Sequence, residues 1–317
     1  MNVTVIICTH NRCGSLIKAL ESIGASTLPS FIEWEVLVVD NNSNDDTREV
    51  VEEFCRRYPG RFGYLFEPRP GKTYALNSGI RELRGDILVF TDDDVTVEQD
   101  WLQRLTSNLN HGKWAGAGGL TVPERSFVPP PWLPTNLRYG LAPLAIFDLG
   151  AEARELAESP YGNNMAFRRE LFQKYGDFRT DLGPCAGSQN PQKGEDSEFG
   201  TRVLGGGERL RYEALAIVYH SVPQSRMQKQ YFLQWWFDKG RSDILAFGKP
   251  LNVRWHAFGV PLYLLRRLAV WTVRWMLAFR PAKRFACKLS VWTLAGQILE
   301  CRGHSADRRR VGSNGRT

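Results

Sequence analysis

Residues 87–95 read ILVFTDDDV, four apolar residues followed by a threonine, three adjacent aspartates and a valine. The apolar run is too short for a helix and is typical of a strand buried in a parallel sheet. Three neighbouring carboxylates repel one another unless a cation lies among them, and carboxylates suit hard ions such as magnesium or manganese. The stretch therefore predicts a buried strand that ends in a metal site, with a solvent-exposed acidic turn as the alternative.

Strand patterns alternate with helix patterns on the N-terminal side of this stretch. The expected strands are Val3–Cys8 (VTVIIC), Glu35–Val39 (EVLVV) and Phe62–Phe66, and the expected helices are residues 15–23, 46–57 and 73–83. This alternation predicts an α/β fold with a doubly wound, mainly parallel sheet. Ligands on such sheets bind beyond the carboxyl ends of the strands. We therefore expect Thr9 to Arg12, Asp40 and Asp92 to Asp94 to converge at one edge.

The second half of the chain adds two candidate functional groups. After a Pro-rich stretch at residues 122–149, order returns at residues 164–175 as a strand followed by a helix. Glu195 and Asp196 open a helix, where the helix dipole favours acidic residues; a carboxylate there can also act as a general base. His220 closes a last strand, AIVY, and is either a neutral metal ligand or a structural histidine.

Composition limits the classes of partner and compartment. The 317 residues carry a net charge of +7, and the basic residues concentrate after Arg254 beside apolar, Trp-rich sequence. This pattern favours an anionic membrane surface over nucleic acid, for which no binding motif is present. The six cysteines are scattered and form no metal or disulfide pattern, which indicates a reducing compartment. The chain opens on a strand pattern without a signal peptide, so we expect a cytoplasmic protein.

The C-terminal third predicts a helical appendage that associates with membranes. We expect one domain over residues 1–225, amphipathic helices over residues 226–301 and a disordered basic tail over residues 302–317. No segment offers the ~18 uncharged apolar residues of a membrane span. On a helical wheel the arginines at 266, 267 and 274 share one arc, outside which lies the stripe Leu264, Leu268, Trp271 and Trp275. This arrangement favours a helix lying in a membrane interface; the alternative is a helix packed on the protein with its arginines reaching water.

Two other functions compete for the aspartate cluster. Asp92, Asp94 and Thr96 spell DxDxT, the nucleophile loop of haloacid-dehalogenase-type phosphatases, in which Asp92 would accept a phosphoryl group. That loop follows the first strand of such enzymes, whereas here it follows the fourth. A non-catalytic membrane adaptor is the third possibility. A phosphate loop around Lys72 fails because Phe66 stands where the motif needs glycine.

The ordered set of motifs resembles the family 2 glycosyltransferases, which have the GT-A fold and invert the anomeric centre. The resemblance covers residues 3–220 and rests on VTVIICTHNR, VLVVDNNSNDDT, GKTYALNSGI, FTDDDVTVEQDWL, GNNMAFRRELFQKYGDF and GEDSEFGTRVLGGGERLRYEALAIVYH, in that order. It implies an α/β fold of GT-A type. It also implies a nucleotide-diphosphate-sugar donor and a divalent metal, Mn²⁺ or Mg²⁺.

The resemblance also implies roles for individual residues. The donor-binding positions are Thr9, His10, Asn11, Arg12, Asp40, Asn42, Lys72, Asp92 and Asp93. Among these, Thr9 to Arg12 would shape the pocket for base and ribose, Asp40 would bond the base and Asp93 would contact the ribose. The metal positions are Asp94, Asp92 and His220. Asp196 matches the catalytic base, and the acceptor-side positions are Glu195 and Asn164.

The sequence departs from the processive polysaccharide synthases of the same family. Those enzymes carry a QxxRW motif and several membrane spans, whereas residues 230–236 here read QYFLQWW, without the arginine. We therefore expect transfer of a single sugar to a hydroxyl acceptor. The basic, apolar C-terminal region suits a lipid-linked acceptor in envelope glycan assembly. The expected location is the cytoplasm, peripheral on the inner face of the cell membrane.

Overall fold

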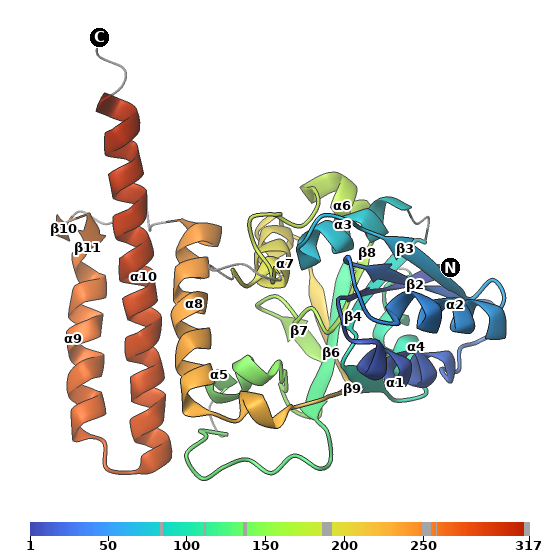
Figure 1. Cartoon of the computed structure of the whole chain (residues 1–317), viewed down its shortest axis with the longest axis horizontal. Helices are drawn as coiled ribbons and strands as arrows, with labels where there is room; N and C mark the ends of the chain where they lie inside the picture. Colours follow the sequence, from blue (N-terminus) through green and yellow to red (C-terminus); the bar gives the residue numbers. More distant parts are fainter. Residues whose placement is uncertain are drawn as a thin grey trace. The chain divides into compact units, whose positions relative to one another are not determined.

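The computed structural model describes residues 1–82, 85–110, 112–135, 138–185, 192–248, 255–257 and 259–313. The chain divides into two compact units (Figure 1). The sheet unit comprises residues 1–127, 144–188 and 195–222, and the helical unit comprises residues 128–143, 189–194 and 223–317. The sequence suggested that the first domain ends at residue 225; the last segment of the sheet unit ends at Val222, and two earlier segments belong to the helical unit.

One mixed sheet of nine strands forms the centre of the sheet unit. The strands are β1 (Asn2–Thr9), β2 (Glu33–Asp40), β3 (Phe62–Phe66), β4 (Ile87–Asp92), β5 (Val95–Val97), β6 (Gly116–Pro123), β7 (Arg154–Leu156), β8 (Asn164–Arg168) and β9 (Leu210–His220). Their order is β3-β2-β1-β4-β8-β6-β9-β5, with β7 beside β9. The first four strands are parallel, whereas β8 runs antiparallel to both of its neighbours. The expected α/β fold with a mainly parallel sheet is confirmed.

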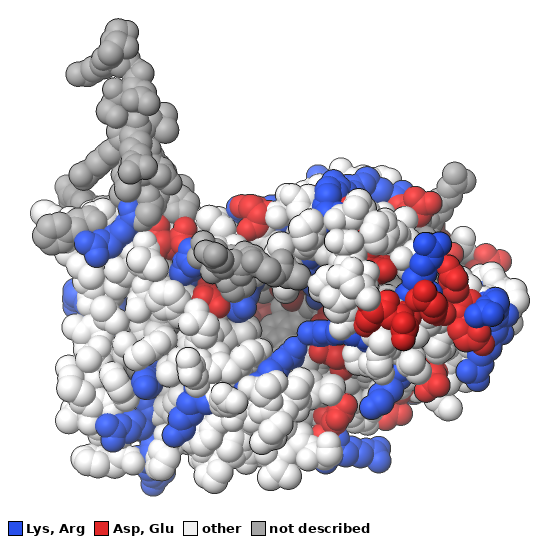
Figure 2. Space-filling view, in the orientation of Figure 1, with Lys and Arg blue, Asp and Glu red and all other residues white. Residues whose placement is uncertain are grey.

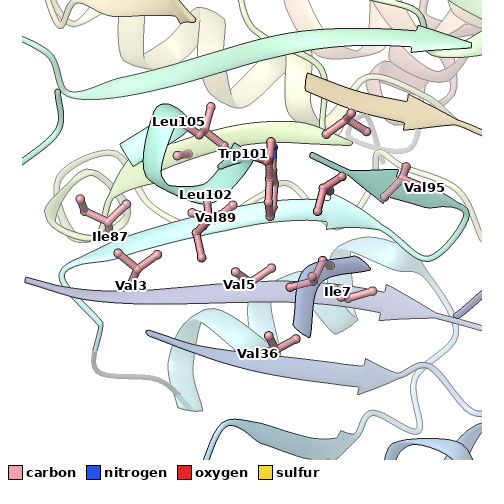
Figure 3. Packing of buried hydrophobic residues seen from close by; sticks show 14 of the residues in the cluster. Val3, Val5, Ile7, Val36, Ile87, Val89, Val95, Trp101, Leu102 and Leu105 are labelled. Atoms are coloured by element: carbon pink, nitrogen blue, oxygen red, sulfur yellow. The ribbon is translucent and has the colours of Figure 1, made fainter. Parts of the chain in front are cut away.

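Helices cover both faces of this sheet. One face packs against α1 (Cys13–Gly24), α2 (Thr47–Arg57) and α4 (Trp101–Thr106), and the other against α3 (Lys72–Glu82), α6 (Glu170–Tyr175) and α7 (Glu195–Gly205). Because side chains alternate along a strand, Val5 and Ile7 enter the first layer and Ile6 enters the second. Figure 3 shows the first layer, where Trp101 of α4 lies among the strand residues. All of these side chains are fully buried.

The strand β6 was not predicted. Its sequence, GAGGLTVP, is rich in glycine, which weakens a strand signal. The glycines are required by close approach: a Cβ on Gly119 would lie 2.3 Å from the carbonyl oxygen of Ala216 on β9. The register of β6 on β9 shifts beyond Gly119, which marks an irregularity at this point.

The helical unit contains α5 (Arg138–Leu141), α8 (Lys229–Phe247), α9 (Leu262–Leu277) and α10 (Pro281–Ser313). The long helices α8 and α10 approach closely where Gly240 and Gly296 face each other's helix: an added Cβ would lie 2.1 Å from a backbone oxygen of the opposite helix at either position. The α10 backbone continues to Ser313, where the sequence suggested a disordered tail from residue 302. Ala306 and the arginines at 308–310 are good helix formers. Residues 314–317 lie outside the described residues.

The apolar stripe on α9 faces the interior of the helical unit, contrary to the expectation of a membrane-facing stripe. Leu264 is 1% exposed in a cluster with Ile244 and Leu294, against which Leu268 and Trp271 pack. The ring of Trp275 lies 6.1 Å from that of Trp292 on α10. The predicted stripe is present, but neighbouring helices cover it. Within the described residues, no helix is long and apolar enough to cross a membrane.

Candidate functional site

The carboxyl ends of three neighbouring strands form the site. The sheet order reverses at β1, which lies between β2 and β4, and such switch points are where ligands bind. The register pairs Thr9 with Asp40 and Cys8 with Asp92. The structure therefore brings together the strand-end residues that the sequence singled out.

A short turn after β4 brings His220 to the aspartates. Asp94 ends this turn, β5 follows at once, and Val95 pairs with His220 in the antiparallel β5–β9 ladder. As a result His220 Nε2 lies 3.4 Å from Asp94 Oδ1. One ligand atom each from Asp92, Asp94 and His220 lies within 4.8 Å of the others. Two carboxylates and an imidazole at this separation fit a divalent transition-metal ion. His220 is 2% exposed, and its Nδ1 atom has no hydrogen-bond partner among the described residues.

Two basic side chains neutralise the aspartates. Arg12 Nη1 lies 3.0 Å from a carboxylate oxygen of both Asp93 and Asp94. Lys72 Nζ lies 2.6 Å from Asp92 Oδ1 and 4.0 Å from Glu195 Oε1. Burial opposes the charged form of Lys72, but the negative charges of Asp92 and Glu195 outweigh it, so the pKa of the amine is raised.

Asp93 is held by the first strand. It is 4% exposed, and Thr9 Oγ1 donates a 2.7 Å hydrogen bond to its Oδ2 atom. Burial raises the pKa of Asp93 to about 6, although the charge of Arg12 opposes the shift. Thr9 and Arg12 thus act on the aspartate cluster from the end of β1.

The loops after β1 and β2 are connected by hydrogen bonds. Asp40 is 3% exposed, and its carboxylate accepts bonds from Tyr64 Oη at 2.8 Å and from the Ser43 amide at 2.9 Å. His10 Nδ1 lies 2.8 Å from the carbonyl oxygen of Asn41. Asn11 and Asn42 both adopt left-handed backbone conformations, with φ of 53° and 64°, which asparagine tolerates better than most residues.

Asn41 is a structural residue that sequence reasoning missed. Its Nδ2 atom donates to the carbonyl oxygens of Glu67 and Arg69, and its Oδ1 atom accepts from the amide of Gly71 at 2.8 Å. These bonds fix the loop that leads into α3 and Lys72. An asparagine directly after a buried strand was the available signal, since such residues bond to backbone groups.

Asp196 lies in the first turn of α7. Its Oδ2 atom accepts a 2.8 Å bond from the Gly162 amide and its Oδ1 atom a 2.6 Å bond from the Ser197 amide. The adjoining residue Asn163 accepts a 2.8 Å bond from Thr91 on β4. A chain of bonds therefore connects Asp196 to the strand that carries the aspartates.

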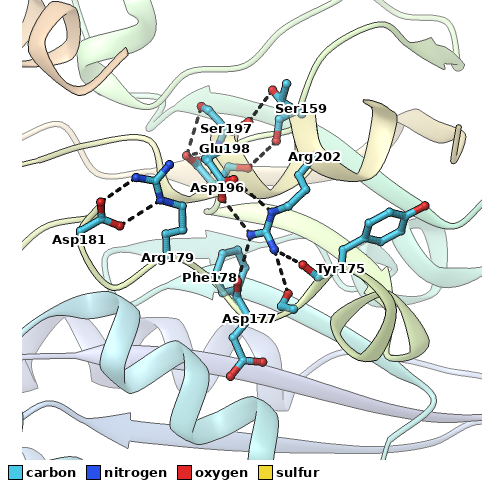
Figure 4. A network of polar contacts seen from close by, with 12 residues as sticks. Ser159, Tyr175, Asp177, Phe178, Arg179, Asp181, Asp196, Ser197, Glu198 and Arg202 are labelled. Atoms are coloured by element: carbon cyan, nitrogen blue, oxygen red, sulfur yellow. Dashed lines mark hydrogen bonds and ion pairs between the residues drawn. The ribbon is translucent and has the colours of Figure 1, made fainter. Parts of the chain in front are cut away.

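A second network fixes α7 from the other side (Figure 4). The guanidinium of Arg202 forms an ion pair with Glu198 at 2.9 Å and donates to the carbonyl oxygens of Tyr175, the last residue of α6, and of Asp177 in the segment after it. Ser159 donates a 2.8 Å bond to the carbonyl oxygen of Asp196. These contacts hold the first turn of α7 in place.

Glu195 is buried next to Asp196. It is 6% exposed, and burial together with the charge of Asp196 raises the pKa of its carboxyl group to about 7, with Lys72 opposing. Asn164 pairs with Thr91, the residue before Asp92, in the β4–β8 ladder, and its side chain is occupied by structural hydrogen bonds. It is 1% exposed, its Oδ1 atom accepts from Trp101 Nε1, and its Nδ2 atom donates to the carbonyl oxygens of Leu120 and Ala216. The expected acceptor-side position is thus a buried connection between β8, β6, β9 and α4.

The fold and this cluster of strand-end carboxylates define a glycosyltransferase of the GT-A type. Residues 4–176 match the family described as "Glycosyl transferase family 2", so the chain belongs to that family. The resemblance inferred from the motifs is confirmed. Membership excludes the phosphatase alternative and makes the adaptor alternative unnecessary, because the chain is a glycosyltransferase enzyme.

Several characterised proteins are similar to this chain. The succinoglycan biosynthesis protein ExoM of Rhizobium meliloti (strain 1021) is 26% identical over 246 residues, 76% of this chain and 74% of that protein. The glucosyl-dolichyl phosphate glucuronosyltransferase of Haloferax volcanii is 27% identical over 252 residues, 77% of this chain and 78% of that protein.

Solved structures share the fold. The mannosyltransferase PcManGT from Pyrobaculum calidifontis, in complex with GDP-Man and Mn²⁺, superposes with a TM-score of 0.58 at 21% identity, covering 98% of this chain and 79% of that one. GalNAc-T7 with UDP, GalNAc and Mn²⁺ superposes with a TM-score of 0.56 at 16% identity, covering 94% of this chain and 56% of that one.

Proposed function

We propose that this glycosyltransferase transfers a single sugar from a nucleotide-diphosphate sugar to a hydroxyl acceptor, with inversion at the anomeric carbon and a divalent metal as cofactor. The observation that carries the proposal is the bonded chain from Asp92–Asp94 through Thr91 and Asn163 to Asp196. It connects a candidate metal site and a candidate base at the carboxyl edge of one sheet. The solved relatives with GDP-Man or UDP support a donor of this class.

The donor nucleotide is bound, in this proposal, over the ends of β1 and β2. Thr9, His10, Asn11 and Arg12 line its path, Asn42 lies beside it, and Asp40 accepts a hydrogen bond from the base. Since both oxygens of Asp40 already have one partner, the base would use a remaining lone pair. Asp93 contacts the ribose, and Lys72 interacts with the anionic part of the donor.

Asp92, Asp94 and His220 would hold the metal. Bound there, a divalent cation supplies charge neutralisation for the diphosphate that leaves the sugar. We favour Mn²⁺ over Mg²⁺ because an imidazole nitrogen suits transition metals, whereas Mg²⁺ prefers an all-oxygen shell. Both solved relatives described above were obtained with Mn²⁺.

Asp196 acts as the general base. Two backbone amides and the Ser197 hydroxyl donate to its carboxylate, and Oδ2, which has a single donor, keeps a lone pair for the proton of the acceptor hydroxyl. As that proton moves to Asp196, the hydroxyl oxygen bonds to the anomeric carbon and the bond from that carbon to the diphosphate oxygen breaks. One displacement from the opposite face inverts the configuration. Glu195 supports the acceptor side.

The acceptor is a lipid-linked glycan, and the enzyme works in the cytoplasm at the inner face of the cell membrane. The names of two relatives support this part of the proposal: one takes part in succinoglycan biosynthesis, and the other acts on glucosyl-dolichyl phosphate. The basic C-terminal sequence supports it independently.

Substitution of the base tests the proposal. Asp196→Asn should lower transfer by about 10²–10⁴-fold because a carboxamide cannot accept the hydroxyl proton, while the dissociation constant of the nucleotide diphosphate stays within about twofold. Asp177→Asn, at a partly exposed site outside the cluster, is the matched control and should transfer normally. Normal turnover by Asp196→Asn would sink the choice of base.

A second measurement tests the metal site. Calorimetry with UDP, GDP and dTDP, with and without Mn²⁺, should show one nucleotide whose binding the metal strengthens. In Asp94→Asn that strengthening should disappear. Metal-independent binding by the unmodified protein would contradict the proposed cofactor.

A further inference from the structure

One face of α9 remains exposed after the helical unit has packed. This surface, called here the α9 outer face, consists of Leu262, Arg266, Ala269, Val270, Val273, Met276 and Leu277, followed by Phe279. These helix positions recur at steps of three or four residues or are immediate neighbours, so they lie on one side of the helix. The two valines are each 50% exposed, Leu277 is 66% exposed and Phe279 is 93% exposed.

The opposite side of α9 is not available to a partner. It carries the stripe Leu264, Leu268, Trp271 and Trp275, which packs inside the helical unit. The side of α9 that can meet a partner is therefore a different one from the side that the helical wheel alone suggested.

The segment that carries the α9 outer face has only positively charged side chains. Between Leu262 and Lys288 the sequence has no aspartate or glutamate and has seven basic residues: Arg266, Arg267, Arg274, Arg280, Lys283, Arg284 and Lys288. The first six of these are exposed. In the view of Figure 2, the lower part of the surface over α9 and α10 shows basic groups among uncharged ones and no acidic group.

This chemistry selects one occupant. A second copy of the chain, paired symmetrically through this face, would place basic residues against basic residues, which is repulsive. Apolar side chains on one helix face, flanked by arginines and free of acids, match the boundary between the headgroups and acyl chains of an anionic bilayer. Since no described helix can span a membrane, α9 would lie along the surface.

We propose that the α9 outer face docks on a membrane rich in anionic phospholipid. Val270, Val273, Met276, Leu277 and Phe279 enter the headgroup boundary, and the arginines and lysines bind lipid phosphates. The inference deepens the proposed function, because docking would bring the enzyme to its lipid-linked acceptor. In that respect it rests on the proposed function. Docking itself does not depend on catalysis.

Vesicle binding by the full chain tests the proposal. Co-sedimentation compares vesicles of phosphatidylcholine with vesicles that also contain phosphatidylglycerol. Each basic residue at an anionic surface strengthens binding by about fivefold, so the mixed vesicles should bind at least tenfold more tightly, and added NaCl should weaken the binding. Two variants should each bind the mixed vesicles at least tenfold more weakly than the parent: the double variant Val273→Glu/Leu277→Glu and the triple variant Arg280→Gln/Lys283→Gln/Arg284→Gln.

Matched controls separate docking from unfolding and from chemistry. Leu215→Glu replaces an equally exposed apolar residue on β9, and Arg48→Gln/Arg56→Gln removes exposed charges from α2; both should bind vesicles normally. All variants should keep the parent circular dichroism and the parent rate with a detergent-solubilised acceptor.

Equal vesicle binding by parent and α9 variants would overturn the inference and leave the proposed function untouched. If the parent showed no Mn²⁺-dependent nucleotide binding, the proposed function would be contradicted and the docking inference would stand. A concentration-dependent dimer that the α9 variants abolish would assign the face to a second copy and also overturn the inference.

Discussion

At the scale of single residues, Lys72 connects the metal site to the base. Its amine lies between Asp92 and Glu195, and Glu195 adjoins Asp196. Buried charges are stable only when they are paired, so this lysine compensates the negative charge of two neighbouring carboxylates. The incomplete compensation is visible at Glu195, whose pKa rises to about 7.

That shift predicts a pH dependence of stability. Because the folded-state pKa of Glu195 lies above its ordinary value of 4.5, the unfolded chain releases the proton first as pH rises. Stability that is present below pH 4.5 is therefore lost between pH 4.5 and about 7. Glu195→Gln, which cannot ionise, should gain roughly 1–3 kcal/mol relative to the parent between pH 5 and pH 8. Urea unfolding at both pH values, with a chelator present, measures this; a pH-independent difference would contradict the shift.

Asn164 is expected to act through structure alone. Replacing it by alanine leaves Trp101 Nε1 and the carbonyl oxygens of Leu120 and Ala216 without their partner. Each unsatisfied buried group costs about 1–3 kcal/mol, so Asn164→Ala should lower the unfolding free energy by about 3 kcal/mol or more. Asn108→Ala, at a partly exposed site, should cost less than about 1 kcal/mol. A stable Asn164→Ala protein with a raised KM for the acceptor alone would contradict this prediction and support the acceptor-side role.

At the scale of elements, the guanidinium of Arg202 is one of the groups that hold α7. Arg202 joins Glu198 on its own helix to the segment that follows α6. Arg202→Met should destabilise the protein by about 3 kcal/mol, since it breaks charged hydrogen bonds and leaves Glu198 unpaired. Transfer should fall while nucleotide affinity changes little, because the base moves and the donor loops do not. Urea unfolding measures the loss of stability, and separate determination of kcat and of the donor dissociation constant measures the effects on transfer and on nucleotide affinity.

Arg179 provides the control for that substitution. It pairs with Asp181 at 2.7 Å, but this aspartate is 55% exposed and belongs to the same loop. Surface pairs contribute about 0–1 kcal/mol, so Arg179→Met should be close to neutral. If both variants lost equal stability, Arg202 would have no special part in holding α7.

The elements also show where sequence reasoning succeeds. The strands β1, β2 and β4 were predicted because uninterrupted β-branched and apolar runs encode strands buried on both faces. The convergence of their terminal residues Asp40 and Asp92 was predicted because ligands on parallel sheets bind beyond the carboxyl ends of the strands. The strand β6 was not predicted because its glycines are required by close contacts with residues distant in sequence, Ala216 and Pro160, which no local pattern reveals. The packing of Trp271 inside the helical unit was not predicted for the same reason, since a helical wheel shows an apolar side but not which helices cover it.

At the scale of the whole molecule, the two units rely on different kinds of packing. The sheet unit buries two apolar layers around parallel strands, whereas α8 and α10 of the helical unit pack through glycines. Tryptophans are distributed unequally between the two units, so a tryptophan signal reports mainly on the helical unit. Seven of the ten (Trp132, Trp235, Trp236, Trp255, Trp271, Trp275 and Trp292) belong to the helical unit, and Trp34, Trp101 and Trp114 belong to the sheet unit.

This difference allows each unit to be perturbed separately. In Gly296→Val the new side chain would meet the backbone oxygen of Phe237, from which even a Cβ lies only 2.1 Å away, so α8 and α10 must separate. We expect the helical unit to lose about 3 kcal/mol or more, seen as an earlier loss of near-ultraviolet tryptophan dichroism on heating. Nucleotide diphosphate with Mn²⁺ should still raise the melting temperature of the sheet unit, because a ligand stabilises the part that binds it. Gly14→Ala, in α1 with open space around its Cβ, should leave both transitions unchanged or slightly higher. Loss of nucleotide stabilisation in Gly296→Val would mean that the donor site depends on the helical unit.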